Sequence, residues 1–313
     1  MGDNRRVVTA PTLAHLRAFR TVVERGSFAA AAEALGSSQP AVSLHVHALE
    51  ERYGVALLQR LRSGVRLTDA GTVVYARAVA MLRGLDAMEA ELAALRGLEG
   101  GRLVVGASTT IANYALPAPI GRFKELHPAV AVALEVGNTG AVVVHVAAQR
   151  YTLGFIEGPI PPEHAAALQT APFRADELAL VVAGTSSLAD RARLTLDELA
   201  TLPFLMREPG SGTRRVVERA LRAVGVDVTP YLELGHTEAI KTAVSMGLGV
   251  SILSRQAVAC ETHTGELRIV PVEGLDLQRV YTAIAPHGTR FTPAEQAFLA
   301  IAGVGDAWTG TSC

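Results

Sequence analysis

The chain has 313 residues, of which 49% are hydrophobic, a composition that excludes intrinsic disorder and suffices for two or three domain cores. No apolar run approaches the roughly 18 residues that span a bilayer, and the N-terminal pattern is not that of a signal peptide, so we expect a soluble, cytoplasmic protein without a membrane partner. The net charge is −1, yet residues 1–66 carry nine arginines against five acidic residues, a surplus of basic charge that suits a polyanion but equally suits a segment that is merely soluble.

Three short helices are predicted first. Apolar residues at helical spacing predict a helix over residues 12–25, with Thr12 as its N-cap. An alanine-rich second helix follows over residues 28–35, where small side chains allow close packing. Ser38 caps a third helix that we expect to reach about Tyr53.

A hairpin and one long helix follow. Residues 54–67 predict a small β-hairpin, or wing, that turns at Ser63-Gly64. From residue 68 the apolar residues recur alternately at four and three positions, which is a heptad seam. A seam this regular favours pairing with a second copy of the chain over burial against the chain's own C-terminal part. Its members are Val74, Ala78, Met81, Leu85, Met88, Leu92 and Leu95.

Short apolar strands then alternate with helical segments. This alternation predicts a largely parallel sheet with helices on both faces, and the proline-rich stretch 158–162 divides it into two such sheets. Ligands in this architecture bind in a crevice at the carboxyl ends of the strands. The predicted strands are Leu103–Ala107, Val130–Val136, Leu153–Ile156, Leu178–Ala183, Phe204–Arg207, Tyr231–Leu234, Val250–Leu253 and Val280–Ile284.

Several strings of residues carry a family resemblance. The N-terminal string is LRAFRTVVERGSFAAAAEALGSSQPAVSLHVHALEERYGVALLQR, followed by RLTDAG at residues 66–71, and the C-terminal strings are GASTTIANYALP, GNT, GFIEGP, REPGSGTR and HTEAIKTAVSMGLGVSIL. Over essentially its whole length the chain resembles the LysR-type transcriptional regulators. The C-terminal strings are similar to the branch that includes regulators of carbon fixation and of sulfur assimilation.

The resemblance implies a fold and a function. The fold class is α+β overall, with an all-α winged helix-turn-helix, a long linker helix and an α/β periplasmic-binding-protein-like domain of two lobes. The implied function is sequence-specific binding of double-stranded DNA, switched by a small-molecule effector, in a homodimer or a homotetramer that is a dimer of dimers. RNA polymerase is a further possible partner. The expected boundaries are 1–67 for the DNA-binding domain, 68–98 for the dimerisation helix and 102–303 for the effector-binding domain, with lobe I at about 102–163 and 268–303 and lobe II at about 172–266.

The third helix is the expected DNA reader, because an α-helix fits the major groove. Gln39 can bond an adenine, Ser43 a base or phosphate, and Ala41 can touch a thymine methyl. His45 and His47 depart from the family's usual Lys, Arg or Gln, so exposed histidines without a DNA role remain an alternative, as does a solvated basic edge for the wing arginines. The DNA-binding set is Ser38, Gln39, Pro40, Ala41, Ser43, His45, His47, Arg60, Arg62 and Arg66.

Two turns are candidates for binding a small anion. Residues 108–110 follow the first strand and open a helix, and residues 207–213 repeat that arrangement, so hydroxyls and free N–H groups gather there. A helix cap with no ligand is the alternative. Glu157 would repel an anion unless it pairs with Arg207 or meets a protonated ligand, and we expect a structural pairing. The predicted effector-binding set is Ser108, Thr109, Thr110, Asn138, Thr139, Arg207, Ser211, Thr213 and Thr237.

Two other classes of protein compete with this interpretation. An enzyme is disfavoured, since the chain has no GxSxG elbow and no phosphate-binding loop, and we expect no catalytic residue. A stand-alone periplasmic binding protein is disfavoured by the missing signal peptide and the roughly 100 residues before the first strand. Cys260 and Cys313 are the two cysteines and lack metal-binding spacing, so we expect no metal and no cofactor. The role of Cys260 is left open.

Overall fold

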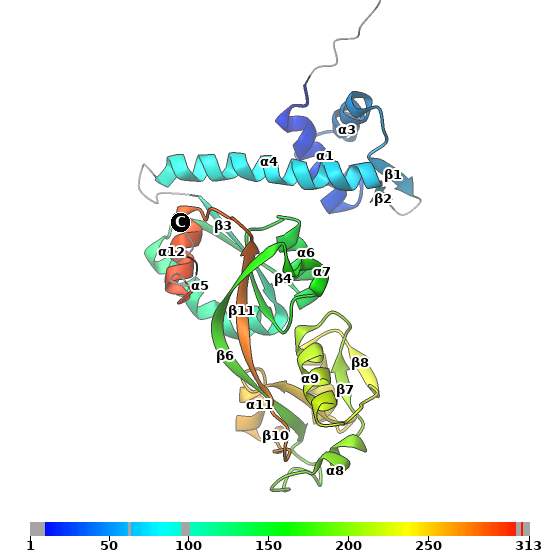
Figure 1. The fold of residues 1–313 in the computed structure, drawn as a ribbon, viewed down its shortest axis with the longest axis vertical. Helices are drawn as coiled ribbons and strands as arrows, with labels where there is room; N and C mark the ends of the chain where they lie inside the picture. Colours follow the sequence, from blue (N-terminus) through cyan, green and yellow to red (C-terminus); the bar gives the residue numbers. More distant parts are fainter. Residues whose placement is uncertain (1–9, 62–63, 95–100, 305–307, 309–313) are drawn as a thin grey trace, which may run out of the picture. The chain divides into compact units, whose positions relative to one another are not determined.

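The computed structural model describes residues 10–61, 64–94, 101–304 and 308. It divides into two compact units, Met1–Leu92 and Ala93–Cys313, which we treat separately (Figure 1). Four sequence predictions, Arg62, the hairpin turn at Ser63, Leu95 and the end of the long helix near Leu98, lie outside the described residues.

The first unit, here called the head, begins with three capped helices. The hydroxyls of Thr12, Ser27 and Ser38 each accept a hydrogen bond from the backbone three residues further on, and each such cap is worth about 1 kcal/mol. Gly26 and Gly54 end the first and third helices in the left-handed conformation. The three predicted helices are therefore confirmed, as α1 (Leu13–Arg25), α2 (Phe28–Ala34) and α3 (Gln39–Tyr53).

The wing is fastened to α3 by a carboxylate. Strands β1 (Leu58–Leu61) and β2 (Gly64–Leu67) pair antiparallel. Glu50 Oε1 accepts the backbone N–H groups of Leu57 at 2.8 Å and Leu58 at 3.2 Å. This bond fixes where β1 leaves the helix, so it sets the position of the wing relative to α3.

The long helix α4 (Asp69–Ala94) differs in part from the predicted seam. Val74 and Ala78 pack with Leu82 into the core of the head itself, because these three residues are spaced by four and share one face of the helix. The prediction that Val74 and Ala78 face a second chain is therefore wrong. The later seam residues Met81, Met88 and Leu92 are 60%, 50% and 55% exposed.

The second unit is built on one seven-stranded mixed sheet. The strand order is β10-β6-β11-β5-β3-β4, and β9 also pairs with β6. Only the pairs β3/β4 and β3/β5 are parallel, whereas β11/β5, β11/β6, β10/β6 and β9/β6 are antiparallel. The strands are β3 (Arg102–Ser108), β4 (Ala131–Gly137), β5 (Leu153–Glu157), β6 (Leu168–Ala183), β9 (Ser251–Ser254), β10 (Leu267–Ile269) and β11 (Gln278–Pro286).

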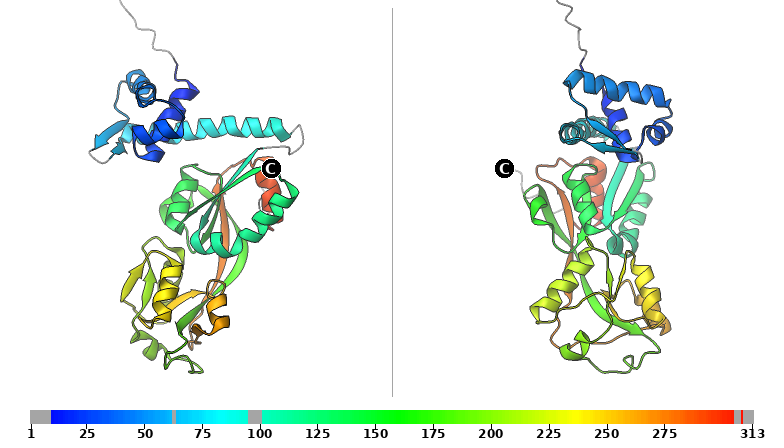
Figure 2. Two further views of the ribbon diagram at one scale, coloured as in Figure 1. Left: turned by 180° about the vertical axis from the view of Figure 1, so that it is seen from behind. Right: turned by 90° about the vertical axis from the view of Figure 1, so that its right-hand side faces the viewer.

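The predictions of a largely parallel sheet and of two separate sheets are both wrong, because the long strand β6 pairs antiparallel with strands of both lobes. Strand β6 is 16 residues long, and its first part pairs with β11 while its last part, from Leu178, pairs with β9 and β10. These two strands therefore run from one lobe into the other, as the green and orange ribbons show in Figures 1 and 2. A separate two-stranded parallel sheet consists of β7 (Leu205–Arg207) and β8 (Leu232–Leu234).

Each lobe has its own core. Lobe I packs Leu103, Phe123, Phe155 and Phe298, and lobe II packs Leu180, Phe204, Val217 and Ile252. The lobe I helices are η1 (Ile111–Ala115), α5 (Pro117–Leu126), α6 (Thr139–Ala147), α7 (Pro162–Ala165) and α12 (Pro293–Ile301). The lobe II helices are α8 (Leu196–Ala200), α9 (Gly212–Ala223), α10 (Thr237–Ser245) and α11 (Ala259–Thr264). Within the described part of the chain, no helix combines the length and apolar character needed to cross a membrane.

Candidate DNA-reading surface and effector site

One side of α3 carries the residues predicted to read DNA. Val42, Val46 and Leu49 are buried and hold the helix against the head. Around the rest of the helix Gln39, Pro40 and His47 are exposed, and Ala41, Ser43 and His45 are partly exposed. The structure thus brings the predicted set together at and beyond the N-terminal end of one helix, where side chains reach base edges in helix-turn-helix proteins.

Both histidines of α3 have neighbours. The ring of His45 lies 5.2 Å from the ring of His15 on α1. Burial, and secondly His45, lower the pKa of His15. His47 Nε2 lies 3.6 Å from Glu51 Oε1. These contacts place the two rings on the surface of the head.

Arg60 of the wing leans back onto α3. Its guanidinium lies 4.8 Å from the centre of the Phe28 ring and donates to Ser43 Oγ at 3.4 Å. Arg66 is exposed on β2. Arg60 and Ser43, two predicted DNA contacts from different elements, therefore lie side by side.

In the second unit, the end of β3 presents three buried hydroxyls. Ser108 Oγ is fully buried and has no hydrogen-bond partner among the described residues. Thr109 Oγ1 donates to the Gly137 carbonyl at 3.3 Å, and Thr110, 3% exposed, acts to lower the pKa of the Glu157 carboxylate. The turn leads into η1, a five-residue π-helix that lacks a side-chain cap, so hydroxyls rather than a capped helix start characterise this end of the sheet.

The N-terminus of α6 touches lobe II. Asn138 Oδ1 caps the helix by accepting from the Ala141 N–H at 2.9 Å, and its Nδ2 donates to Glu208 Oε1 of lobe II at 3.3 Å. The Gly140 N–H donates to the Gly210 carbonyl at 3.1 Å. The predicted turn at residues 207–213 therefore meets the start of α6 across the lobe boundary.

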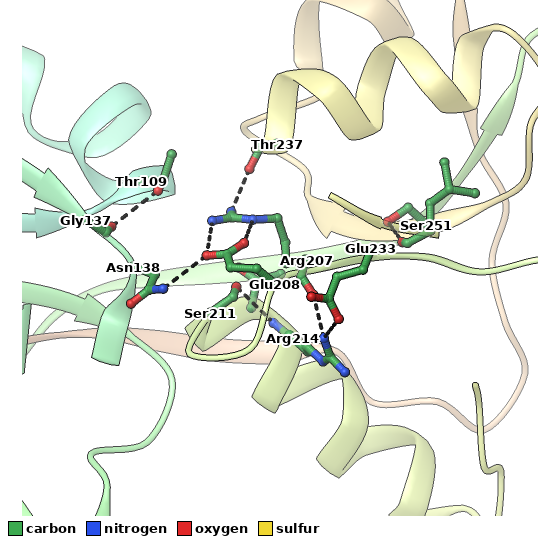
Figure 3. Close-up of polar contacts among 12 residues, drawn as sticks. Thr109, Gly137, Asn138, Arg207, Glu208, Ser211, Arg214, Glu233, Thr237 and Ser251 are labelled. Atoms are coloured by element: carbon green, nitrogen blue, oxygen red, sulfur yellow. Dashed lines mark hydrogen bonds and ion pairs between the residues drawn. The ribbon is translucent and has the colours of Figure 1, made fainter. Parts of the chain in front are cut away.

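Arg207, at the end of β7, is the central basic residue of this boundary. Its side chain is 3% exposed. Nε and Nη2 donate to the two carboxylate oxygens of Glu208 at 2.8 and 3.1 Å, and Nη1 donates to Thr237 Oγ1 at 3.0 Å. Figure 3 shows the two planar groups facing each other, with Asn138 and Thr237 on either side. The considered pairing of Arg207 with Glu157 is wrong, because the adjacent Glu208 occupies the guanidinium.

Glu157 pairs instead with Thr213, which the sequence predicted for this site, and with Arg279, which it did not. Thr213 Oγ1 donates to Glu157 Oε1 at 3.1 Å, and Arg279 Nη2 lies 3.6 Å from Oε2. Arg279 also donates to Asp176 at 2.6 Å and to Thr213 at 2.9 Å. Burial raises the pKa of Glu157, and Arg279 opposes that rise. The expectation of a structural pairing for Glu157 agrees with these contacts, although the partner differs.

Two more residues of the predicted effector-binding set make hydrogen bonds to the chain itself. Thr139 Oγ1 donates to the Glu157 carbonyl at 2.9 Å, and Ser211 Oγ caps α9 by accepting from the Arg214 N–H at 3.3 Å. A further lobe-to-lobe bond joins Tyr114 of η1 to Glu238 of α10 at 2.6 Å, and burial, then Glu238, raise the pKa of Tyr114 to about 12. The lobes are thus bridged at several points.

A winged helix-turn-helix unit joined to a two-lobed unit defines a ligand-responsive transcription regulator. The model of the bacterial regulatory helix-turn-helix protein of the lysR family matches residues 13–72, and the LysR substrate binding domain matches residues 96–303. The chain therefore belongs to the LysR family, and it is a DNA-binding transcriptional regulator with an effector-binding domain.

The chain is also similar to individual relatives and to solved structures. The chain is 35% identical to a RuBisCO operon transcriptional regulator of Acidithiobacillus ferrooxidans, over 92% of each chain. It is 36% identical to the uncharacterized HTH-type transcriptional regulator YeiE of Escherichia coli K12, over 92% of this chain and 96% of YeiE. Among solved structures, full-length OxyR from Pseudomonas aeruginosa has a TM-score of 0.73, with 24% identity and 94% of each chain covered. The regulatory domain of CcmR from Synechocystis PCC6803, in complex with 2-PG, has a TM-score of 0.59 and 28% identity over 68% of this chain and 99% of that domain.

Proposed function

We propose that the second unit binds a small anionic effector between its two lobes and that this binding switches the activity of the head on DNA. The observation that carries the proposal is the nearly buried guanidinium of Arg207, which lies at the lobe boundary beside Thr237 and Asn138. Guanidinium groups bind carboxylates and phosphates through paired hydrogen bonds. The complex of the CcmR regulatory domain with 2-PG supports an effector in this domain.

A thermal-shift screen of small anions tests this proposal. Sulfite, sulfate, phosphosugars and dicarboxylates are the compounds to compare, and a ligand present at 100 times its Kd adds about 2.7 kcal/mol of stability. The stabilisation should disappear in Arg207→Gln and persist in Arg222→Gln, which changes an exposed arginine of α9. Stabilisation by neutral or cationic compounds alone would contradict an anionic effector.

For DNA, we place base contacts on Gln39, Ala41 and Ser43 and phosphate contacts on the wing. The full or partial exposure of these side chains in the N-terminal part of α3 supports this assignment. A gel shift with a promoter fragment, repeated at several salt concentrations, separates base reading from phosphate contact, because only phosphate contacts change the salt dependence. The same assay separates a regulator from an enzyme, and we propose neither a catalytic role nor a cofactor. No cluster of metal-ligating side chains occurs among the residues that the structure describes.

We also place a homodimer contact on α4. The exposed residues Met81, Met88 and Leu92 follow the seam spacing beyond the part of the helix that packs on the head. Burying them against an identical helix would remove apolar surface from water. A homotetramer built from two such dimers, and contact with RNA polymerase, are carried over from the family resemblance. Sedimentation of the intact chain measures the oligomeric state.

A further inference from the structure

A carboxylate of the protein itself already occupies the Arg207 guanidinium. Glu208 meets it through two parallel hydrogen bonds of 2.8 and 3.1 Å, the same fork that a bound carboxylate or phosphate makes with an arginine. A third N–H group, on Nη1, is bound to Thr237. An anion that arrives at Arg207 therefore finds the Nε and Nη2 pair, which would hold it in a fork, already in use (Figure 3).

The same carboxylate joins the lobes. Glu208 Oε1 accepts from Nη2 of Arg207 in lobe II and also from Nδ2 of Asn138 in lobe I, at 3.3 Å. Glu208 thus contacts one predicted effector residue from each lobe. A bound anion between the lobes would make these two contacts itself.

Three other cations near the lobe boundary are already paired. Arg214 pairs with Glu218 and Glu233, Lys241 pairs with Glu238 and Glu261, and Arg279 pairs with Asp176. Arg279 and Asp176 are each at most 2% exposed, whereas Glu208 is 22% exposed. Glu208 also lies in a turn with Gly210 at a φ of 92°. Of the acids on Arg207 and Arg279, it is the one that can swing into solvent.

We propose that Glu208 is a tethered stand-in for the effector's anionic group. It fills the anion subsite of Arg207 and bridges to Asn138 when no effector is bound, and the effector displaces it. This inference rests on the proposed anionic effector. Because Arg207 is available only in the fraction of molecules whose Glu208 has swung away, the apparent Kd rises by the inverse of that fraction. The device selects for multiply charged anions such as phosphate esters or dicarboxylates, since a single carboxylate offers Arg207 nothing that Glu208 does not.

The test uses the full-length chain and inorganic phosphate as the probe, with acetate as a singly charged comparison. Thermal midpoints are measured against anion concentration for wild type, Glu208→Gln and the double variant Arg207→Gln/Glu208→Gln. Glu233→Gln is the matched control, because Glu233 pairs with Arg214 on the same lobe without touching Arg207. The double variant has no unpaired guanidinium, so it also shows whether the fold tolerates loss of the Glu208 charge.

Glu208→Gln should bind phosphate at least tenfold more tightly than wild type and should gain measurable binding of acetate. Glu233→Gln should behave as wild type, and the double variant should bind neither anion. Equal phosphate affinity in wild type and Glu208→Gln, abolished in the double variant, would overturn the role of Glu208 and leave the anionic effector standing. If the double variant binds phosphate as well as wild type does, or if no variant binds it, the anion subsite at Arg207 fails, and this inference fails with it.

Discussion

Gly212 of lobe II lies close against Glu157 and Thr139 of lobe I, and replacing it by alanine should push the lobes apart. A Cβ at this position would overlap the Glu157 carbonyl oxygen and the Thr139 hydroxyl of lobe I. Gly212 is the first residue of α9, a backbone conformation that alanine adopts readily. Crowding against the other lobe is therefore the main cost of the substitution.

The size of the effect follows from the contacts at stake. Overpacking a close contact costs about 1–3 kcal/mol. If the lobes move apart instead, the bond from Thr213 to Glu157 and the bond from the Gly140 N–H to the Gly210 carbonyl are lost at about 1 kcal/mol each. Either route destabilises the second unit by about 1–3 kcal/mol. Gly121→Ala is the control, because its Cβ would meet nothing within 4 Å and alanine stabilises a helix interior by up to about 1 kcal/mol.

Two measurements on the intact chain check this prediction. The thermal midpoint of the second unit should fall in Gly212→Ala and should hold or rise in Gly121→Ala. Amide exchange at Gly140, whose N–H is bound to the Gly210 carbonyl, should accelerate only in Gly212→Ala. Equal midpoints and equal exchange in the two variants would refute the close approach of the lobes at Gly212.

Four other changes have defined outcomes. Arg279→Met should cost about 3–5 kcal/mol in urea unfolding, because it leaves the Asp176 carboxylate buried without its cation; a loss below 1 kcal/mol would contradict this. Wild type should lose stability as the pH rises above 4.5, because the raised pKa of Glu157 lets the folded state keep a proton that the unfolded chain releases. Glu157→Gln should remove this loss, and parallel stability curves of the two proteins from pH 4 to 8 would contradict the prediction. Gln39→Ala should weaken the cognate site by about 1–3 kcal/mol in a gel shift and relax one base position per half-site, whereas uniform weakening on all sequences would remove Gln39 from the base contacts. Met88→Asp should split the oligomer in sedimentation, as it charges an exposed seam position, and an unchanged oligomer would place the interface elsewhere.

The sequence predicted the head well because its signals are local. The N-cap residues Thr12, Ser27 and Ser38 each predict the start of a helix whose first hydrogen bonds lie within four residues. Gly26 and Gly54 mark helix ends. Each decision depends on a few adjacent side chains, so no distant contact can overrule it. The seam was harder, because spacing alone does not say whether an apolar face meets the protein's own core or a second chain.

The sheet was predicted less well because pairing is a long-range property. The first part of β6 contains a proline and alternates weakly, yet it pairs with β11 about 110 residues later, in register from Leu168 with Pro286. The candidate site was likewise predictable only where the signal is local. Arg207 could be identified from its motif. Its pairing with Glu208 could not, because adjacency in the sequence does not determine where a side chain points. Arg279 and Asp176 reach the site only through the crossing strands.

The position of the buried ion cluster limits how an effector can act on this unit. Asp176 and Arg279 lie on β6 and β11, the two strands that continue from lobe I into lobe II, whereas Glu157 ends β5 in lobe I and Thr213 begins α9 in lobe II. A rotation of the lobes about these strands can preserve the bond between Arg279 and Asp176, because the two residues are on adjacent strands, but it must stretch the bond between Thr213 and Glu157. The anion that we propose at Arg207 would therefore shift the lobes only by as much as its affinity differs between the two arrangements, and that difference would have to exceed the cost of the Thr213 bond.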